Sequence, residues 1–324
     1  MPQPLVFPGG RRFAFTIVDD TDVATVANVK PLYDLLHQLG MRTTKTVWPV
    51  GCPEGSRNYH SSQTLEDEDY CAFVLDLQRK GFEITWHGAT MESSRRERTL
   101  VALERFRERL GAYPRIHINH SCNRENLYWG SARVDDTLVR TVLTRATGAN
   151  GQYTGDAKSS PYYWGDKCAH FTYARNLTCN DINTARFNPS MPYRDSQRPL
   201  IPLWFSATDA EGLHEFNQLL RPSNQERLER EGGFCILATH LGKGYVRDGQ
   251  VDPTARRQLE ALARRPGWFP TVSELLDWLQ IQGRGGELSR DEWRGMQWRW
   301  LRDLGVRKLT GRRERVRRIN GEIP

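Results

Sequence analysis

The sequence predicts an α/β protein in which strands and helices alternate along most of the chain. Short apolar or β-branched runs alternate with longer stretches whose apolar residues recur at helical spacing. Several helical stretches end at a glycine, the residue expected just past a helix C-terminus. This alternation requires a parallel sheet with crossover helices, either an open doubly wound sheet or a barrel. No glycine-rich phosphate loop opens a helix after a strand, so a nucleotide-binding fold is disfavoured.

The expected elements follow one another in a regular order. Apolar runs predict strands at 12–18, 42–50, 82–87, 115–120, 199–207 and 232–240. Helical spacing predicts helices within 25–40, 64–81, 93–111, 133–148, 213–231, 253–265, 271–283 and 288–305. Thr64 with Asp67, and Ser289 with Glu292, have the spacing of a capping box. These signals place most of the helix starts and strand ends.

Two segments depart from the regular alternation. Residues 150–199 are rich in Tyr, Asn, Asp, Pro and Arg and have no long helical pattern, which favours long loops near a functional site. The last expected helix carries an apolar stripe that we expect to pack on the domain, formed by Trp293, Met296, Trp300 and Leu304. We therefore expect a main domain at 1–283 and a helical, basic C-terminal extension at 284–324.

The composition is that of a globular protein with a sizeable core, since 38% of the 324 residues are hydrophobic and 26% are charged. The first ten residues contain no apolar run long enough for a signal peptide, and no stretch is apolar enough to span a membrane. A cytoplasmic location is the expectation. No pair of the six cysteines has CxxC spacing, so free thiols without a catalytic role are expected.

The formal net charge of +7 is concentrated at the C-terminus. Residues 290–324 contain ten Arg and one Lys against five acidic residues, which leaves the rest of the chain near neutral. This basic segment could make a weak contact with an anionic lipid or nucleic acid surface, although a solvated charge run is the simpler interpretation.

Acidic and histidine side chains gather where the predicted parallel strands end. Asp19, Asp20 and Asp22 follow the first strand, His87 follows the third, and His240 follows a late one. The fourth carries His117, Asn119 and His120. Functional groups of parallel α/β folds lie at these carboxyl ends. Aspartate and histidine together are the ligand set of a catalytic zinc or a similar divalent metal, which activates water for hydrolysis.

The segments "FAFTIVDDTD", "GFEITWHGAT" and "GGFCILATHLGKG", in this order, resemble the first, second and last motifs of the NodB-like polysaccharide deacetylases, or carbohydrate esterase family four. The resemblance spans residues 11–280 and implies a distorted (β/α)7 barrel. It also implies removal of N- or O-acetyl groups from sugars with a divalent metal, most often zinc.

The resemblance assigns roles to four residues. Asp19 matches the general base, Asp20 and His87 match metal ligands, and His240 matches the general acid. Asp22 is expected to favour a helix N-terminus through the helix dipole.

This sequence departs from the family pattern at two places. The second metal histidine of the family falls on Met91, and a thioether is a poor zinc ligand beside carboxylate and imidazole. We therefore expect His120 as the third ligand, with His117 in reserve. The arginine-proline motif of the family is not matched, and "INHSCNRENLYWG" stands in its place. From this stretch we expect substrate contacts by Asn119, Asn123 and Trp129.

The resulting expectation is a metal-dependent hydrolase that deacetylates a sugar or polysaccharide precursor. Three alternatives stay open: a metal-free glycan-binding protein of the same fold, a hydrolase of another C–N or glycosidic bond, and a binding function of the C-terminal segment. The sequence predicts neither the exact substrate nor the oligomeric state.

Overall fold

The chain forms a closed parallel barrel surrounded by helices. The computed structural model describes residues 5–147 and 152–309. The seven barrel strands are β1 (Phe13–Asp19), β2 (Thr44–Val47), β3 (Glu83–Trp86), β4 (Ile116–His117), β5 (Tyr173–Cys179), β6 (Leu203–Asp209) and β7 (Phe234–Thr239). They follow one another around the barrel in chain order, and β1 closes it by pairing with β7. The (β/α)7 barrel expected from the sequence is therefore confirmed.

The first strand is the most connected one. Along one edge, β1 pairs with β7 from Ala14 to Asp19. Along the other edge, β1 pairs with β2 only at Val18 and Asp19, while the short strand β10 (Gly267–Trp268) pairs with its beginning. Every residue of β1 is buried. The end of β1 is therefore held rigidly in the barrel wall, which fixes whatever follows it.

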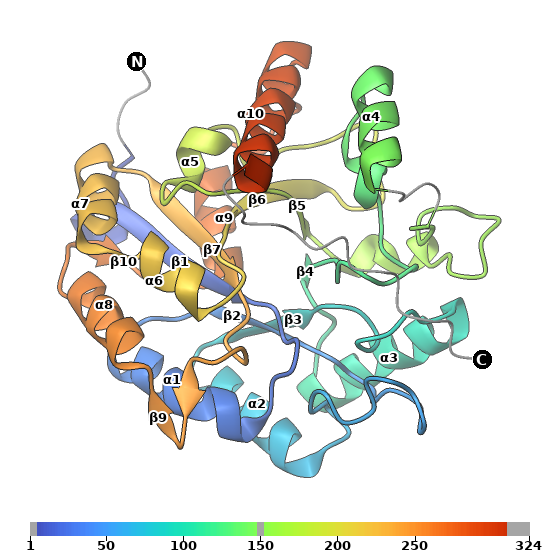
Figure 1. Ribbon diagram of the computed structural model, residues 1–324, viewed down its shortest axis with the longest axis horizontal. Coiled ribbons are helices and arrows are strands. Elements are labelled where there is room, and N and C mark those ends of the chain that lie inside the picture. Colours follow the sequence, from blue (N-terminus) through green and yellow to red (C-terminus); the bar gives the residue numbers. More distant parts are fainter. Residues whose placement is uncertain (1–4, 148–151, 310–324) are drawn as a thin grey trace.

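Helices cover the outside of the barrel (Figure 1). They are α1 (Val26–Gln38), α2 (Glu68–Arg79), α3 (Arg96–Leu110), α4 (Thr137–Thr147), α5 (Thr184–Phe187), α6 (Leu213–Leu219), α7 (Pro222–Glu231), α8 (Pro253–Ala263), α9 (Val272–Ile281) and α10 (Arg290–Leu309). Short 3-10 turns lie at Pro8–Gly10, Gly130–Arg133 and Gly165–His170, and β8 (Val246–Arg247) with β9 (Gln250–Val251) forms a small hairpin. None of the helices in the described ranges is long and apolar enough to cross a membrane.

Three of the expected elements need correction. The segment expected as loops, 150–199, contains the seven-residue barrel strand β5. The single helix expected within 213–231 is two helices, because Pro222 starts a new one at its first turn. The capping box expected at Thr64 is only half formed: Asp67 Oδ2 accepts from Thr64 N at 2.7 Å, but this turn precedes α2, which begins at Glu68 after the N-cap Asp67.

The start of α1 also differs from expectation. Thr25 is the N-cap and forms a capping box with Asn28. No acidic residue lies in the first turn, so Asp22 is not a helix N-terminal residue. It belongs instead to the turn between β1 and α1, where its carboxylate faces the barrel mouth.

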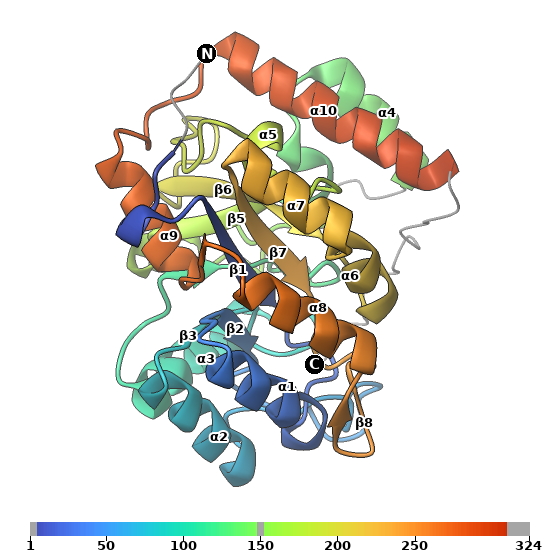
Figure 2. The same ribbon diagram turned by 90° about the vertical axis from the view of Figure 1, so that its left-hand side faces the viewer.

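The last helix packs on the barrel as the stripe predicts. Met296 and Trp300 are buried, and Trp293 and Leu304 pack against the core. The Ser289–Glu292 capping box is present. In both views α10 lies at the same end of the molecule as α4, opposite α1 and α2 (Figure 2). The end of the basic segment, 310–324, lies outside the described residues, and the expected contact of the segment with an anionic surface stays a prediction.

The core is continuous from the barrel interior to the helix layer. All six cysteines are buried free thiols, as expected.

Candidate active site

The two adjacent aspartates at the end of β1 point in opposite directions. Side chains alternate across a strand, so Asp19 and Asp20 cannot face the same side. Asp19 contacts Tyr33 of α1 and Lys45 of β2, on the helix side of the barrel wall. Asp20 contacts Arg175 of β5, which is not a neighbour of β1 in the sheet. Asp20 therefore reaches across the barrel mouth, while Asp19 is buried behind the wall.

Asp20 and Arg175 form a two-bonded ion pair. Arg175 Nη1 donates to Asp20 Oδ1 at 2.9 Å, and Nη2 donates to Oδ2 at 2.7 Å. Burial alone would raise the pKa of Asp20, but Arg175 together with His87 and His240 outweighs it, and the pKa is lowered from its ordinary value. Asp20 is therefore an ionised carboxylate in a fixed orientation.

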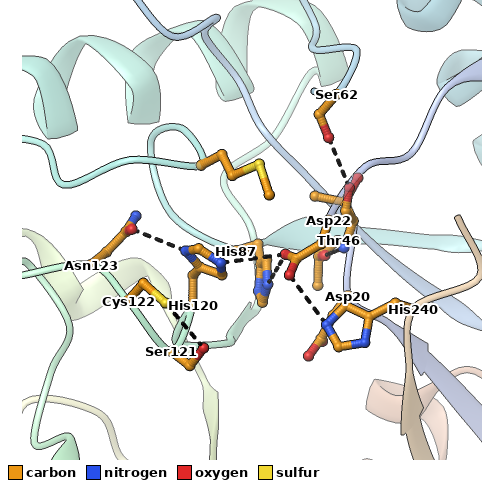
Figure 3. Close-up of polar contacts among 12 residues, drawn as sticks. Asp20, Asp22, Thr46, Ser62, His87, His120, Ser121, Cys122, Asn123 and His240 are labelled. Carbon is orange, nitrogen blue, oxygen red and sulfur yellow. Dashed lines mark hydrogen bonds and ion pairs between the residues drawn. The ribbon is translucent and has the colours of Figure 1, made fainter. Parts of the chain in front are cut away.

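Three histidines surround Asp22 (Figure 3). His87 Nε2 lies 3.4 Å and His120 Nε2 lies 3.5 Å from Asp22 Oδ1, and His240 Nε2 lies 3.3 Å from Oδ2. Lys243 Nζ lies 3.5 Å from the same Oδ2. Burial would raise the pKa of Asp22, yet His120 and His240 hold it well below its usual range. Asp22, and not Asp20, is thus the carboxylate on which the histidines converge.

His87 follows directly on β3 and lies deep in the site. Its ring is 4.9 Å from that of the buried Trp48. Gly88 continues the chain at φ 134°, and a Cβ there would stand 3.2 Å from Trp48, so this turn requires glycine. Burial lowers the pKa of His87 in spite of Asp20 and Asp22 nearby. His87 is therefore favoured as a neutral imidazole, the form that binds metals.

The tautomer of His120 follows from its partner. Asn123 Nδ2 donates to the backbone oxygens of Thr90 and Glu92 at 2.9 and 3.1 Å, which identifies its Oδ1 as the acceptor. His120 Nδ1 therefore donates to Asn123 Oδ1 at 3.0 Å. A neutral His120 then presents the lone pair of Nε2 to the carboxylate of Asp22. His120 Nε2 and Asp22 Oδ1 would then both be acceptors, and two acceptors lie this close favourably only with a proton or a cation between them.

His240 is oriented in the same manner. Its Nδ1 donates to the backbone oxygen of Glu211 at 2.8 Å, which turns Nε2 toward Asp22. Burial would lower the pKa of His240, but Asp22, helped by Asp20, outweighs it and the pKa is raised. His240 is mostly buried, with 13% of its side chain exposed, and it is thereby suited to carry a proton at the mouth of the site.

The donor set around Asp22 fits a divalent metal of the zinc type. Ligand atoms bound at about 2.1 Å by a tetrahedral metal lie roughly 3.4 Å apart. The separations of Asp22 Oδ1 from His87 Nε2 and His120 Nε2 agree with this spacing and are long for hydrogen bonds. In the described part of the chain, however, no three such side chains already converge as a preformed metal site. Binding would therefore require the imidazoles to turn toward a common point.

The other residues expected at the site lie around it with different contacts. Asn119 is buried. Its Nδ2 donates to Leu127 O, and its Oδ1 accepts from Leu127 N and bonds to His117 Nε2. Burial lowers the pKa of His117 to about 4, which keeps it neutral, and its Nε2 is committed to Asn119. Asn123 is fully buried beside His120, and the ring of Trp129 is covered by the Arg133 guanidinium at 4.2 Å. These contacts favour structural or positioning roles over substrate contact.

Sequence reasoning missed two residues of this site. Arg175 lies in β5, inside the segment expected as loops, although "TYARNLTC" is a strand-length run that ends before Asn180 and Asp181. Asp22 was assigned to a helix start, although it is the third acid of the same strand end. The three aspartates were expected at the strand end where they lie, but the direction in which each side chain points depends on where β1 ends.

Comparison with known proteins adds similarity of shape only. No protein-family model matches the sequence, and no curated protein matches it. A protein from Mycobacterium smegmatis provisionally described as a polysaccharide deacetylase is 14% identical, with a TM-score of 0.49 over 89% of this chain and 97% of that one. Puue allantoinase is 12% identical, with a TM-score of 0.49 over 87% and 94%.

The peptidoglycan deacetylase PdaC from Bacillus subtilis is 12% identical, with a TM-score of 0.41 over 86% of this chain and 95% of that one. All three TM-scores are below 0.5, so the activities of these proteins carry no argument for this chain.

Proposed function

We propose that the protein is a metal-dependent hydrolase that removes an acetyl group from a sugar or polysaccharide precursor. The observation that carries this proposal is that the Nε2 atoms of three histidines lie within 3.5 Å of the Asp22 carboxylate, beside the Asp20–Arg175 pair. The motif resemblance of the sequence supports the acetylated sugar as substrate.

Asp22, His87 and His120 are the residues that would hold the metal. Asp22 takes the ligand role that the sequence suggested for Asp20, because it is the carboxylate next to the histidines. A divalent metal bound there would acidify a water molecule and polarise the carbonyl under attack. The buried amide of Asn123 fixes the ring of His120, as hydrogen-bond partners of metal-binding histidines commonly do.

Asp20 is the proposed general base. A carboxylate whose two oxygens both accept from a guanidinium is ionised but only weakly basic, so it accepts a proton only from an acidified donor. Its burial and its fixed orientation suit a single proton transfer. Arg175 holds Asp20 and takes no proton itself.

His240 is the proposed general acid. Its raised pKa favours the protonated ring, and Nδ1 is already committed to Glu211. The proton on Nε2 is therefore the one available to the departing alkoxide or amine.

The test is acetate release from N-acetylglucosamine oligomers and from acetylated xylan, by the wild type and by Asp22→Asn. We expect the wild type to release acetate from one of them and Asp22→Asn to be slower by a factor of about 100 or more. Lys243→Met is the matched control, because it removes a polar neighbour of Asp22 Oδ2 without removing a proposed ligand. Undiminished acetate release by Asp22→Asn would overturn the proposal.

A second candidate is a metal-free carbohydrate-binding protein with the same barrel. One observation favours it: among the described residues, no three His, Cys, Asp or Glu side chains are already arranged to hold one metal ion. It predicts binding of the same oligomers without acetate release, so the same experiment separates the two.

A further inference from the structure

A buried ion pair lies behind the wall of the barrel, on the opposite face of β1 from Asp20. Asp19 and Lys45 are both fully buried, and Lys45 Nζ donates to Asp19 Oδ2 at 2.9 Å. Tyr33 donates to the same oxygen at 2.8 Å. Burial alone would lower the pKa of Lys45, but Asp19 together with Tyr70 outweighs it, and the pKa is raised. The pair is therefore a charged one inside the protein.

Stability gives little reason for such a pair. Removing two charges from water costs several kcal/mol, and apolar side chains of similar size often stabilise a protein as well or better. A specific geometric task is a better explanation for charges at this place.

The second oxygen of Asp19 shows what that task is. Asp19 Oδ1 accepts the backbone N–H of Leu241 at 2.8 Å, and Leu241 directly follows His240. Because Lys45 and Tyr33 fix the first oxygen, the second is an acceptor at a defined position. An apolar side chain could not supply this acceptor.

The loop held by Asp19 is tight. Lys243 N donates to His240 O at 2.9 Å and closes the turn. A Cβ on Gly242 would stand 3.0 Å from Ala24 Cα, so the loop lies directly on the segment after β1. The ring of His240 is turned by Glu211, while the backbone beside it is held by Asp19.

We propose that Asp19 is a positioning residue for His240: its anchored carboxylate holds the Leu241 N–H and thereby sets the approach of the imidazole to the leaving group. This inference rests on the proposed function and deepens it. It replaces the role of general base expected from the sequence, since Asp19 faces Lys45 and Tyr33 behind the barrel wall.

The test uses two double variants that differ only in the acceptor. Lys45→Met with Asp19→Asn removes both charges but keeps a side-chain oxygen for Leu241 N. Lys45→Met with Asp19→Leu removes the charges and the oxygen. Asp19→Asn alone is unsuitable, because it would leave Lys45 charged and buried without its partner.

The first readout is hydrogen exchange of the Leu241 amide, which needs no substrate. We expect exchange in the Leu variant to be faster than in the Asn variant by a factor of about 10, the value of one hydrogen bond, with the amides of β7 unchanged. Equal exchange at Leu241 in the two variants would overturn the inference.

The second readout compares two leaving groups. p-Nitrophenyl acetate releases a phenolate that needs no general acid, whereas an N-acetylglucosamine oligomer releases a poor leaving group. We expect the Leu variant to lose a factor of about 100 in kcat on the oligomer and little on p-nitrophenyl acetate, with the Asn variant close to wild type on both. An equal loss on both substrates would mean general damage and would contradict positioning of the acid.

If the wild type hydrolyses neither of these substrates nor acetylated xylan, the proposed function fails, and the exchange readout still decides whether Asp19 holds the loop of His240.

Discussion

Asp20 on β1 and Arg175 on β5 are joined across the barrel mouth by two hydrogen bonds of 2.9 and 2.7 Å. The two residues of the pair are 155 positions apart in the chain. The pair fixes a buried carboxylate beside Asp22 and the three histidines around it. Loss of the pair should therefore affect both the free energy of unfolding and the rate of acetate release.

Replacing Arg175 should separate these two effects. Arg175→Met leaves the Asp20 carboxylate buried without its counter-charge, and we expect a loss of about 3–5 kcal/mol in the free energy of unfolding. Arg175→Lys keeps the charge but cannot form both hydrogen bonds, so we expect a smaller loss of stability and acetate release slower by a factor of about 10–100. Urea unfolding and acetate assays measure both. Wild-type stability of Arg175→Met would show that the ion pair is not what holds Asp20.

The pH dependence of stability should carry the signature of Glu125. This carboxyl accepts from Ser94 N at 2.9 Å and from Asn123 Nδ2 at 3.0 Å, but burial raises its pKa to about 7. The folded state thus keeps a proton that the unfolded chain releases near its ordinary value of 4.5. The contribution of Glu125 to the free energy of unfolding is fully present below the pKa of the unfolded state. It declines as the pH rises to about 7, by roughly 3 kcal/mol.

Glu125→Gln removes this titration. We expect the free energy of unfolding of the variant to change less than that of the wild type between pH 4.5 and pH 7, as measured by urea unfolding at each pH. The difference between the two proteins is the relevant quantity, because other groups titrate equally in both. Identical slopes would show that Glu125 is not protonated in the folded state.

Two tryptophans of α10 test whether this helix is part of the barrel domain. Trp300 is 2% exposed and packs in the core, whereas Trp298 is 67% exposed. We expect Trp300→Ala to cost about 3–5 kcal/mol and Trp298→Ala to change stability by less than about 0.5 kcal/mol. Thermal or urea unfolding distinguishes them. Equal effects of the two substitutions would contradict the packing of α10 on the barrel.

The barrel could be predicted from the sequence because most of its strands are apolar and are followed by regular helices. β5 could not, since Arg175 and Asn176 lie within it and its flanks are rich in turn residues. Those polar residues interrupt the strand, so the apolar pattern that identifies ordinary strands is weak there. The strand that supplies the partner of Asp20 was therefore the one missed.

The sequence predicts at which strand ends the site residues lie, but not which way the aspartate side chains point. Asp19, Asp20 and Asp22 lie within four residues, and the sequence does not indicate which carboxylate enters the barrel. That depends on the pairing register of β1 with β2 and β7, which fixes the face of each side chain. His87, His120 and His240 were expected at the site and lie there, because each follows a strand at the same end of the barrel.

The most direct test of the account is the metal content of the purified protein after supplementation with zinc, for the wild type, Asp22→Asn and Asp20→Asn. The account predicts about one metal ion per chain in the wild type and in Asp20→Asn, and a loss of the metal in Asp22→Asn. A wild type without metal, or a loss in Asp20→Asn with retention in Asp22→Asn, would contradict it.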